Sequence, residues 1–227
     1  MSTMEFLVTM TTQVPGGTTQ DAVDEIRGRE AARSRELAAQ GNLLRLWRPP
    51  LQPGEWRTFG LFAADDGENL EKVLASMPLR VWRSDEVTPL ALHPNDPAAT
   101  GSSGAGSESE SGSARDAQLE AAQPSVEFLT TFEVEFPEGT PEKTAADALA
   151  GEADRARELA GQGHLERLWK LPADPAKPGV ARALGLWRAR DAAHMQAMLD
   201  SLPLDAWMTV QTTPLTRHPS DPAITAV

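Results

Sequence analysis

The chain has 227 residues, a length that favours two domains of about 100 residues each. It contains 21 Lys and Arg residues against 33 Asp and Glu residues, and this net charge of −12 argues against a nucleic-acid or anionic-membrane partner. The absence of cysteine excludes disulfides, thiolate catalysis and zinc–thiolate sites, and the absence of tyrosine removes one class of acid or base.

The N-terminal sequence MSTMEFLVTM has neither the basic stretch nor the apolar core of a secretory signal. No apolar run in the sequence approaches the roughly 18 residues that a membrane span needs. We therefore expect a soluble, cytoplasmic protein whose partner is a small-molecule substrate.

Strand and helix patterns follow one another along the first part of the chain. The sequence predicts a strand at 4–14, a helix that follows the turn at 17–21 and ends at Gln40, a strand from Leu43, a strand at 56–63, a helix at 66–78 and a strand at 81–91. This β-α-β-β-α-β order is typical of the split βαβ, or ferredoxin-like, plan.

The same order of elements occurs twice in the sequence. EAARSRELAAQGNLLRLW at 30–47 recurs as EADRARELAGQGHLERLW at 152–169, and TPLALHPNDPA at 88–98 recurs as TPLTRHPSDPA at 213–223. Between the copies, residues 99–123 are rich in Gly, Ser and Glu, a composition typical of a flexible linker. We expect one domain at 1–98 and a second at 124–227. The second copy's remaining elements are predicted as strands at 126–136, 181–188 and 206–216 and a helix at 191–203.

Helix-end signals accompany this pattern. Gly41 and Gly163 follow the predicted ends of the long helices, where a positive φ favours glycine. In the second copy, Thr140 is predicted as the N-cap and Pro141 as the first helical residue. The fold class we expect is α+β, with two ferredoxin-like βαββαβ units whose sheets pair face to face as a dimeric α+β barrel-like pseudo-dimer, open to further homo-oligomerisation.

A carboxylate lies on the apolar stripe of each long helix. Spacings of three and four residues place Glu30 in line with Val23, Ile26 and Leu37, and Glu152 occupies the same place in the second copy. Burial raises the pKa of a carboxyl group toward the range useful for proton transfer, so Glu30 and Glu152 are the candidate catalytic residues. The alternative is a structural role, in which Glu30 pairs with Arg33 or with an arginine across the sheet such as Arg45.

Other residue types give weaker signals. His93 and His218 recur in the tails of the two copies, and we interpret them as part of an exposed terminal clamp rather than as catalytic groups. His164 and His194 have no counterpart in the first copy. No spacing of histidines and carboxylates indicates a metal site, and no glycine-rich phosphate loop is present, so no cofactor is predicted. The tryptophans are interpreted as core or pocket-wall residues.

The combined motifs resemble the muconolactone Δ-isomerase family. The shared pieces in the first copy are EFLVTM, EAARSRELAAQG, LLRLWR, MPL and LHPN; in the second they are EFLTTF, EADRARELAGQG, LERLWK, LPL and RHPS. The resemblance implies a small ferredoxin-like, cofactor-independent isomerase of the β-ketoadipate pathway for aromatic catabolism. A glutamate of the first helix, matched here by Glu30 and Glu152, would move a proton between carbons of an unsaturated lactone. Family members form dimers that assemble further, so the fused pair resembles a covalent dimer.

Differences from the family pattern concern the pocket. Where the family has a lysine three residues before the glutamate, this chain has Arg27 and Leu149, and polar positions on the third strand become Thr58 and Ala183. A less polar pocket favours a lactone, quinone or polyketide-like ligand of specialised metabolism. Arg27 is predicted to orient an anionic group of the substrate. The full set of predicted substrate-binding residues is Arg27, Arg45, Trp47, Thr58, Trp82, Arg167, Trp169 and Trp207.

Three functions remain open from the residues. The first is an isomerase with Glu30 and Glu152 as general bases. The second is a non-catalytic small-molecule-binding protein that has kept the fold. The third is a cofactorless monooxygenase or cyclase of a specialised pathway on the same fold.

Overall fold

The computed structural model describes residues 3–100 and 125–225, which form two compact units. Unit 1 comprises Met1–Ala91 together with Leu215–Val227, and unit 2 comprises Leu92–Pro214. Each unit therefore contains most of one sequence repeat and the C-terminal tail of the other. Residues 101–123 of the predicted linker lie outside the described residues, whereas residues 99 and 100 belong to a short helix, α3 (Pro97–Thr100).

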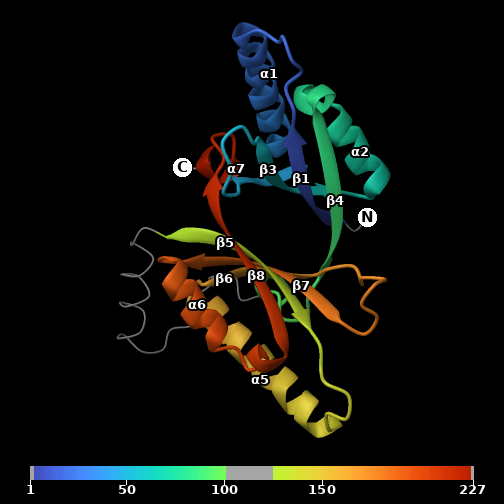
Figure 1. Cartoon of the computed structure of the whole chain (residues 1–227), viewed down its shortest axis with the longest axis vertical. Coiled ribbons are helices and arrows are strands. Elements are labelled where there is room, and N and C mark those ends of the chain that lie inside the picture. The colour runs from blue at the N-terminus through green and yellow to red at the C-terminus, as the bar shows by residue number, and fades with distance from the viewer. Residues whose placement is uncertain (1–2, 101–124, 226–227) are drawn as a thin grey trace. The chain divides into compact units, whose positions relative to one another are not determined.

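Unit 1 is built around an antiparallel sheet with the strand order β4-β1-β3-β2. Its elements, labelled in Figure 1, are β1 (Met4–Thr12), α1 (Gln20–Ala39), β2 (Leu43–Arg48), β3 (Arg57–Ala64), α2 (Gly67–Ala75), a 3₁₀ turn at Pro78–Trp82 and β4 (Arg83–Leu92). The short helix α7 (Pro222–Thr225) completes the unit.

Unit 2 repeats this order with β8-β5-β7-β6. Its elements are β5 (Val126–Val134), α5 (Glu142–Gly161), β6 (Leu165–Lys170), β7 (Ala181–Ala189), α6 (Ala192–Asp200), a 3₁₀ turn at Asp205–Trp207 and β8 (Met208–Arg217). The predicted α+β class with two ferredoxin-like βαββαβ units is confirmed.

One face of the unit 1 sheet packs against both helices. Strand β1 alternates in burial, with Phe6, Val8 and Met10 buried. These side chains share one apolar core with Leu37 of α1 and Leu74 of α2. The predicted stripe of α1 is confirmed, since its burial deepens from the partly exposed N-terminal turns to the fully buried Leu37.

The ends of the two long helices follow the predicted signals in part. Gly41 and Gly163 have φ values of 76° and 80°, as expected for the residue after a helix. Thr19 caps α1 by accepting a hydrogen bond from the Ala22 N–H at 3.3 Å. The predictions for Thr140 and Pro141 were wrong, because the Thr140 hydroxyl donates to the Pro137 carbonyl at 2.7 Å, Pro141 is the N-cap residue and α5 begins only at Glu142.

The segment after α2 departs from the prediction and builds part of a pocket. The helix ends at Ala75 instead of 78, and the next strand begins at Arg83 instead of 81. Between them, Pro78 opens a 3₁₀ turn, since proline cannot continue the hydrogen bonds of an α-helix. This turn leaves the Leu79 N–H free to donate to a side chain of α1.

The tail of the second repeat is tied into unit 1 by a buried carboxylate. Asp221, fully buried, pairs with Arg45 at 3.2 Å and accepts a hydrogen bond from the Leu46 N–H at 3.1 Å. Glu30 therefore pairs with neither of the two named arginines, but it does pair with another arginine, Arg83 of β4, at 3.1 Å. Arg33 instead pairs with Glu36 at 2.8 Å.

Unit 2 has the matching arrangement. Asp96, in the tail of the first repeat, is fully buried and pairs with Arg167 at 3.2 Å. The His93 N–H donates to the Leu168 carbonyl at 3.3 Å, which aligns this tail beside β6.

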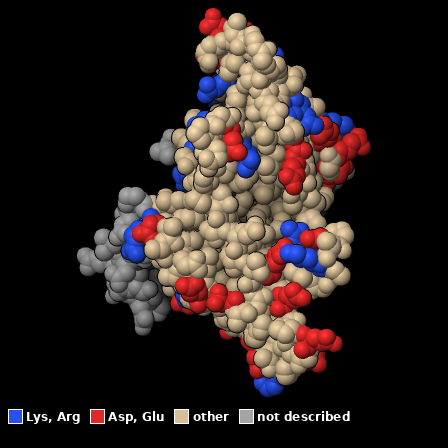
Figure 2. Space-filling view, in the orientation of Figure 1, with Lys and Arg blue, Asp and Glu red and all other residues tan. Residues whose placement is uncertain are grey.

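Two features bear on the nucleic-acid and membrane partners that the sequence argues against. Acidic and basic side chains lie beside one another on the face shown in Figure 2, and neither sign forms a continuous stripe there. Within residues 3–100 and 125–225, no helix is long and apolar enough to cross a membrane.

Candidate functional site

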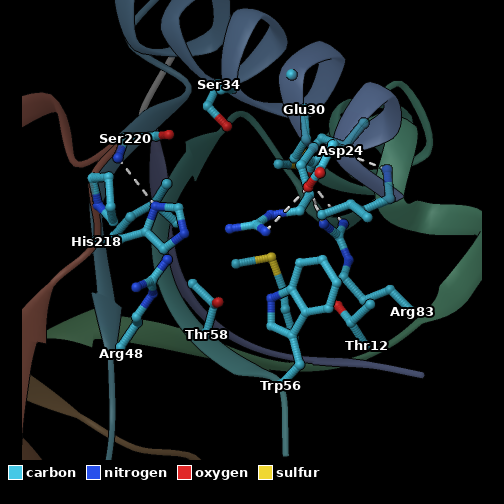
Figure 3. A pocket seen from close by; sticks show the side chains of 18 residues that line it. Thr12, Asp24, Glu30, Ser34, Arg48, Trp56, Thr58, Arg83, His218 and Ser220 are labelled. Atoms are coloured by element: carbon cyan, nitrogen blue, oxygen red, sulfur yellow. Dashed lines mark hydrogen bonds and ion pairs between the residues drawn. The ribbon is translucent and has the colours of Figure 1, made fainter. Parts of the chain in front are cut away.

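A pocket of about 420 Å³ lies in unit 1 beside Glu30 (Figure 3). Helix α1, strands β1–β4, the 3₁₀ turn and the tail of the second repeat all contribute to its wall. Its lining includes Arg27, Glu30, Ser34, Arg48, Thr58, Arg83 and His218. The chain therefore brings together three predicted site residues, Arg27, Glu30 and Thr58.

The Glu30 carboxylate is held from two sides. Its Oε2 accepts a hydrogen bond from the Leu79 N–H at 2.8 Å, and its Oε1 accepts one from the Arg83 guanidinium at 3.1 Å. Burial raises the pKa of Glu30 above its ordinary value of 4.5, whereas the Leu79 N–H and the Arg83 cation lower it and the Asp85 carboxylate raises it. A carboxylate with a raised pKa that still has a cationic partner is suited to accept a proton.

His218 lies across the pocket from Glu30 (Figure 3). Its Nδ1 accepts a hydrogen bond from the Ser220 N–H at 3.1 Å, so in the neutral ring the proton is on Nε2. Burial and the positive charge of Arg48 lower the pKa of His218 from 6.5 to about 4. Near neutral pH the side chain is therefore an uncharged hydrogen-bond donor.

Two arginines give the same pocket a positive side. Arg48 and Arg27 both contribute to the lowered pKa of His218, which places their charges near the imidazole. Arg27 lies over the Trp56 ring, with its guanidinium carbon 5.7 Å from the ring centroid, and is 3.6 Å from Asp24. An anionic group of a ligand would find both cations at this wall.

Three other predicted residues of the first repeat are absent from the described lining of this pocket: Arg45, Trp47 and Trp82. Arg45 stacks over the Trp47 ring at 4.7 Å and pairs with Asp221. Trp47 is itself only 1% exposed. These positions indicate packing and the anchoring of a tail.

A second pocket of about 520 Å³ lies in unit 2 beside Glu152. It occupies the equivalent place in the fold, but most of its wall is apolar. Its lining includes His93, Phe132, Val134, Leu149, Glu152, Ala156, Lys170, Arg182, Ala183, Trp187 and Met208.

Glu152 is held less firmly than Glu30. Its Oε2 accepts a hydrogen bond from the Leu204 N–H at 3.1 Å, and no described residue forms an ion pair with it. Burial raises the pKa of Glu152 above 4.5, and only this backbone hydrogen bond lowers it. His93 faces the same cavity as the counterpart of His218, and burial and Lys170 lower its pKa as well.

The remaining predicted residues of the second repeat are absent from the described lining of this second pocket: Arg167, Trp169 and Trp207. Arg167 pairs with Asp96 and stacks over Trp169 at 4.8 Å. Trp207 packs against Phe136, with ring centroids 5.1 Å apart, and Phe136 lines the pocket.

Sequence reasoning missed the histidines and Arg83. The prediction of an exposed clamp was wrong, because His218 and His93 are half-buried and each lines a pocket in the unit built mainly from the other repeat. Their recurrence in both tails was the signal that could have indicated them. Arg83 could not be found by repetition, since Met208 occupies its place in the second copy.

Across the described chain, no group of three or more histidine, cysteine, aspartate or glutamate side chains is arranged to hold a metal ion. Both pockets include a carboxylate, an imidazole and cationic side chains in their lining. Such groups transfer protons and bind oxygen atoms without an added cofactor.

Solved structures with a similar fold cover nearly the whole chain. A heme-binding protein from Thermus thermophilus has a TM-score of 0.53 and 12% sequence identity, and the match covers 96% of this chain and 94% of that one. A variant of chlorite dismutase from Candidatus Nitrospira defluvii has a TM-score of 0.52 and 8% identity, with coverage of 94% and 91%. At these identities the likeness shows the fold alone.

Each of the sequence relatives matches 40% of this chain. Muconolactone Delta-isomerase 1 of Acinetobacter lwoffii is 33% identical over 92 residues, which are 93% of its length and 40% of this chain. The muconolactone Delta-isomerase of Cupriavidus pinatubonensis is 30% identical over 92 residues, 97% of its length. The family model for muconolactone delta-isomerase matches residues 4–96 and again residues 126–221. The chain therefore belongs to the muconolactone Δ-isomerase family, as a tandem duplication of the family's unit.

Proposed function

We propose that this chain is a cofactor-independent isomerase that moves a proton within an unsaturated lactone bearing a carboxylate. The observation that carries the proposal is the pocket in which Glu30, a buried carboxylate, lies across from the neutral His218 and beside Arg27 and Arg48. The muconolactone Δ-isomerase relatives support the same reaction class.

Proton transfer begins at Glu30. Its carboxylate takes a proton from a ring carbon whose C–H bond is acidified by the conjugated lactone carbonyl. The electron pair of that bond moves onto the carbonyl oxygen and forms a dienolate. The Glu30 carboxyl then returns the proton to a different ring carbon, and the carbonyl forms again. The double bond has moved, and nothing has been oxidised or reduced.

The other side chains assist each stage. The Nε2–H of His218 donates to the developing oxyanion, a type of contact that contributes more in the transition state than in the ground state. Arg27 and Arg48 bind the substrate carboxylate and fix the ring relative to Glu30. The Leu79 N–H and the Arg83 cation lower the pKa of Glu30 against the effect of burial and so favour its ionised form.

The substitution Glu30→Gln in the full chain tests the proposal with muconolactone as the substrate. It keeps the shape of the side chain and removes the base, so we expect kcat to fall by at least about 100-fold. The matched control is Glu152→Gln, which leaves the Glu30 pocket intact. Ultraviolet absorbance of the lactone measures turnover. Full turnover in the Glu30→Gln variant would exclude Glu30 as the base.

A further inference from the structure

The two pockets differ in polarity at five pairs of lining positions that the sequence repeat makes equivalent. The sequence repeat pairs Arg27 with Leu149, Thr12 with Val134, Ser34 with Ala156, Thr58 with Ala183 and Arg83 with Met208, and all ten residues line their respective pockets. Every one of these pairs replaces a polar or charged side chain of the first pocket with an apolar one in the second. The acid, Glu152, and the histidine, His93, are retained.

These replacements remove two of the three cations that line the first pocket, and only Arg48 has a cationic counterpart, Lys170. The second pocket has no counterpart of Arg27, and the position of Arg83 beside the carboxylate is occupied by Met208. Of its cations, Arg182 is 3.4 Å from Glu133 and donates through Nη1 to the Pro172 carbonyl at 3.2 Å, whereas its buried Nε has no hydrogen-bond partner among the described residues. Lys170 is exposed and is not among the groups that shift the pKa of Glu152.

The polar groups that remain suit a ligand oxygen rather than a ligand charge. The Nδ1 of His93 accepts a hydrogen bond from the Asn95 N–H at 3.1 Å, so the neutral ring has a proton on Nε2 to donate. Trp187, which replaces Phe62 of the first repeat, lines the pocket and is 2% exposed. Its indole N–H has no hydrogen-bond partner among the described residues, an unmet donor in a mostly apolar wall.

We propose that the Glu152 pocket is a second ligand site of different specificity, which binds an uncharged, largely apolar cyclic carbonyl compound such as an aryl-substituted lactone. An anionic ligand would lose its hydration there and would meet only the exposed Lys170 and Arg182, whose charge is already paired with Glu133. An apolar ring instead gains contact with Phe132, Leu149 and Met208, while its carbonyl oxygen accepts from His93. This specificity does not rest on turnover at Glu30.

The two pockets can be tested in the intact chain with two probes. The first is 5-phenyl-2(5H)-furanone, an uncharged aryl lactone, and the second is muconolactone, which carries a carboxylate. Isothermal titration calorimetry measures the binding of each probe. The key variant is Leu149→Arg, which restores the first repeat's residue at a position that is 50% exposed and therefore tolerant of charge.

We expect Leu149→Arg to weaken the binding of 5-phenyl-2(5H)-furanone by about tenfold or more, which is a difference of about 1.4 kcal/mol. The triple variant Leu149→Arg, Ala156→Ser, Ala183→Thr should weaken it further. The reciprocal variant Arg27→Leu, Ser34→Ala, Thr58→Ala is the matched control, and it should leave this affinity within about twofold of the parent's.

Three results would overturn the proposal. They are no saturable binding of the aryl lactone to the parent chain, binding that the Leu149→Arg and triple variants leave unchanged, and binding that only the reciprocal variant weakens. Thermal unfolding midpoints confirm that each variant is folded. Turnover of muconolactone by the same preparations is measured separately, so a failure of the Glu30 mechanism is distinguishable from a failure at Glu152.

Discussion

At the scale of single residues, the two glutamates show how surroundings change one side chain's chemistry. Both lie at the same place on a long helix, and both accept a hydrogen bond from a backbone N–H of the segment that follows the second helix of their repeat. Only Glu30 also has a cationic partner, Arg83, which is 2% exposed and is shared with Asp85 at 2.6 Å. The apolar stripe in the sequence indicated both carboxylates. The cation that distinguishes Glu30 from Glu152 is Arg83, which lies 53 residues from Glu30 in the chain and is not repeated.

The pH dependence of turnover should reflect this pair. If Glu30 is the base, kcat/KM rises as pH increases through its pKa in the free enzyme, which lies above 4.5 because of burial. Replacing Arg83 and Asp85 with Met and Val, the residues of the second repeat, removes one charge that lowers the pKa of Glu30 and another that raises it by less. The acid limb of the profile should therefore move to higher pH.

The double replacement is chosen to keep the protein folded. Removing Arg83 alone would leave the buried Asp85 with only Arg80 as a described ion-pair partner, whereas removing both charges together is often nearly neutral for stability. Stopped-time assays with muconolactone between pH 4 and 8 measure the profile. An acid limb that stays in place, or moves to lower pH, would contradict the assigned role of Arg83.

At the scale of elements, local signals predicted the order of strands and helices well. Burial alternation in β1 and the apolar spacing in α1 correspond to the observed core. The errors lie at element ends. The proline at 78 was predicted to end a helix, but the helix ends earlier and the proline opens a 3₁₀ turn, a tertiary arrangement that local propensity does not specify.

Two glycines of the first repeat give a matched test of these end signals. Gly41 has a φ of 76°, so Gly41→Ala should cost about 1 kcal/mol of unfolding free energy because an L side chain is strained there. Gly28 lies inside α1, where an added Cβ would meet nothing within 4 Å. Gly28→Ala should therefore stabilise by about 0.5–1 kcal/mol. Urea unfolding followed by circular dichroism measures both, and equal effects of the two substitutions would contradict this assignment of the helix end.

At the scale of the whole molecule, each compact unit takes its tail from the other repeat. The sequence showed that the tails repeat, but repetition does not say which copy a tail packs on. The ion pairs of the tails show which copy each one packs on, since Asp221 pairs with Arg45 and Asp96 pairs with Arg167. The same exchange supplies each pocket's histidine, so His218 serves the Glu30 pocket and His93 the Glu152 pocket.

Because the tails are exchanged, the equivalent substitutions Asp221→Ala and Asp96→Ala should have similar effects on stability but different effects on turnover. Asp221→Ala leaves the half-buried Arg45 without this carboxylate and the Leu46 N–H without its acceptor, so we expect a loss of about 3 kcal/mol of unfolding free energy. Asp96→Ala should cost a similar amount through Arg167.

Turnover of muconolactone separates the two variants. Asp221 lies three residues after His218, whose N–H donates to the Leu46 carbonyl at 3.0 Å, so loosening this tail displaces the imidazole from the Glu30 pocket. We expect Asp221→Ala to lower kcat by about tenfold or more at a temperature where both variants remain folded, because an oxyanion donor is misplaced. Asp96→Ala should leave kcat nearly unchanged, since its tail lies in the other unit. The reverse result, in which Asp96→Ala is the variant that loses turnover, would mean that each tail packs on its own repeat and that the exchange is wrong.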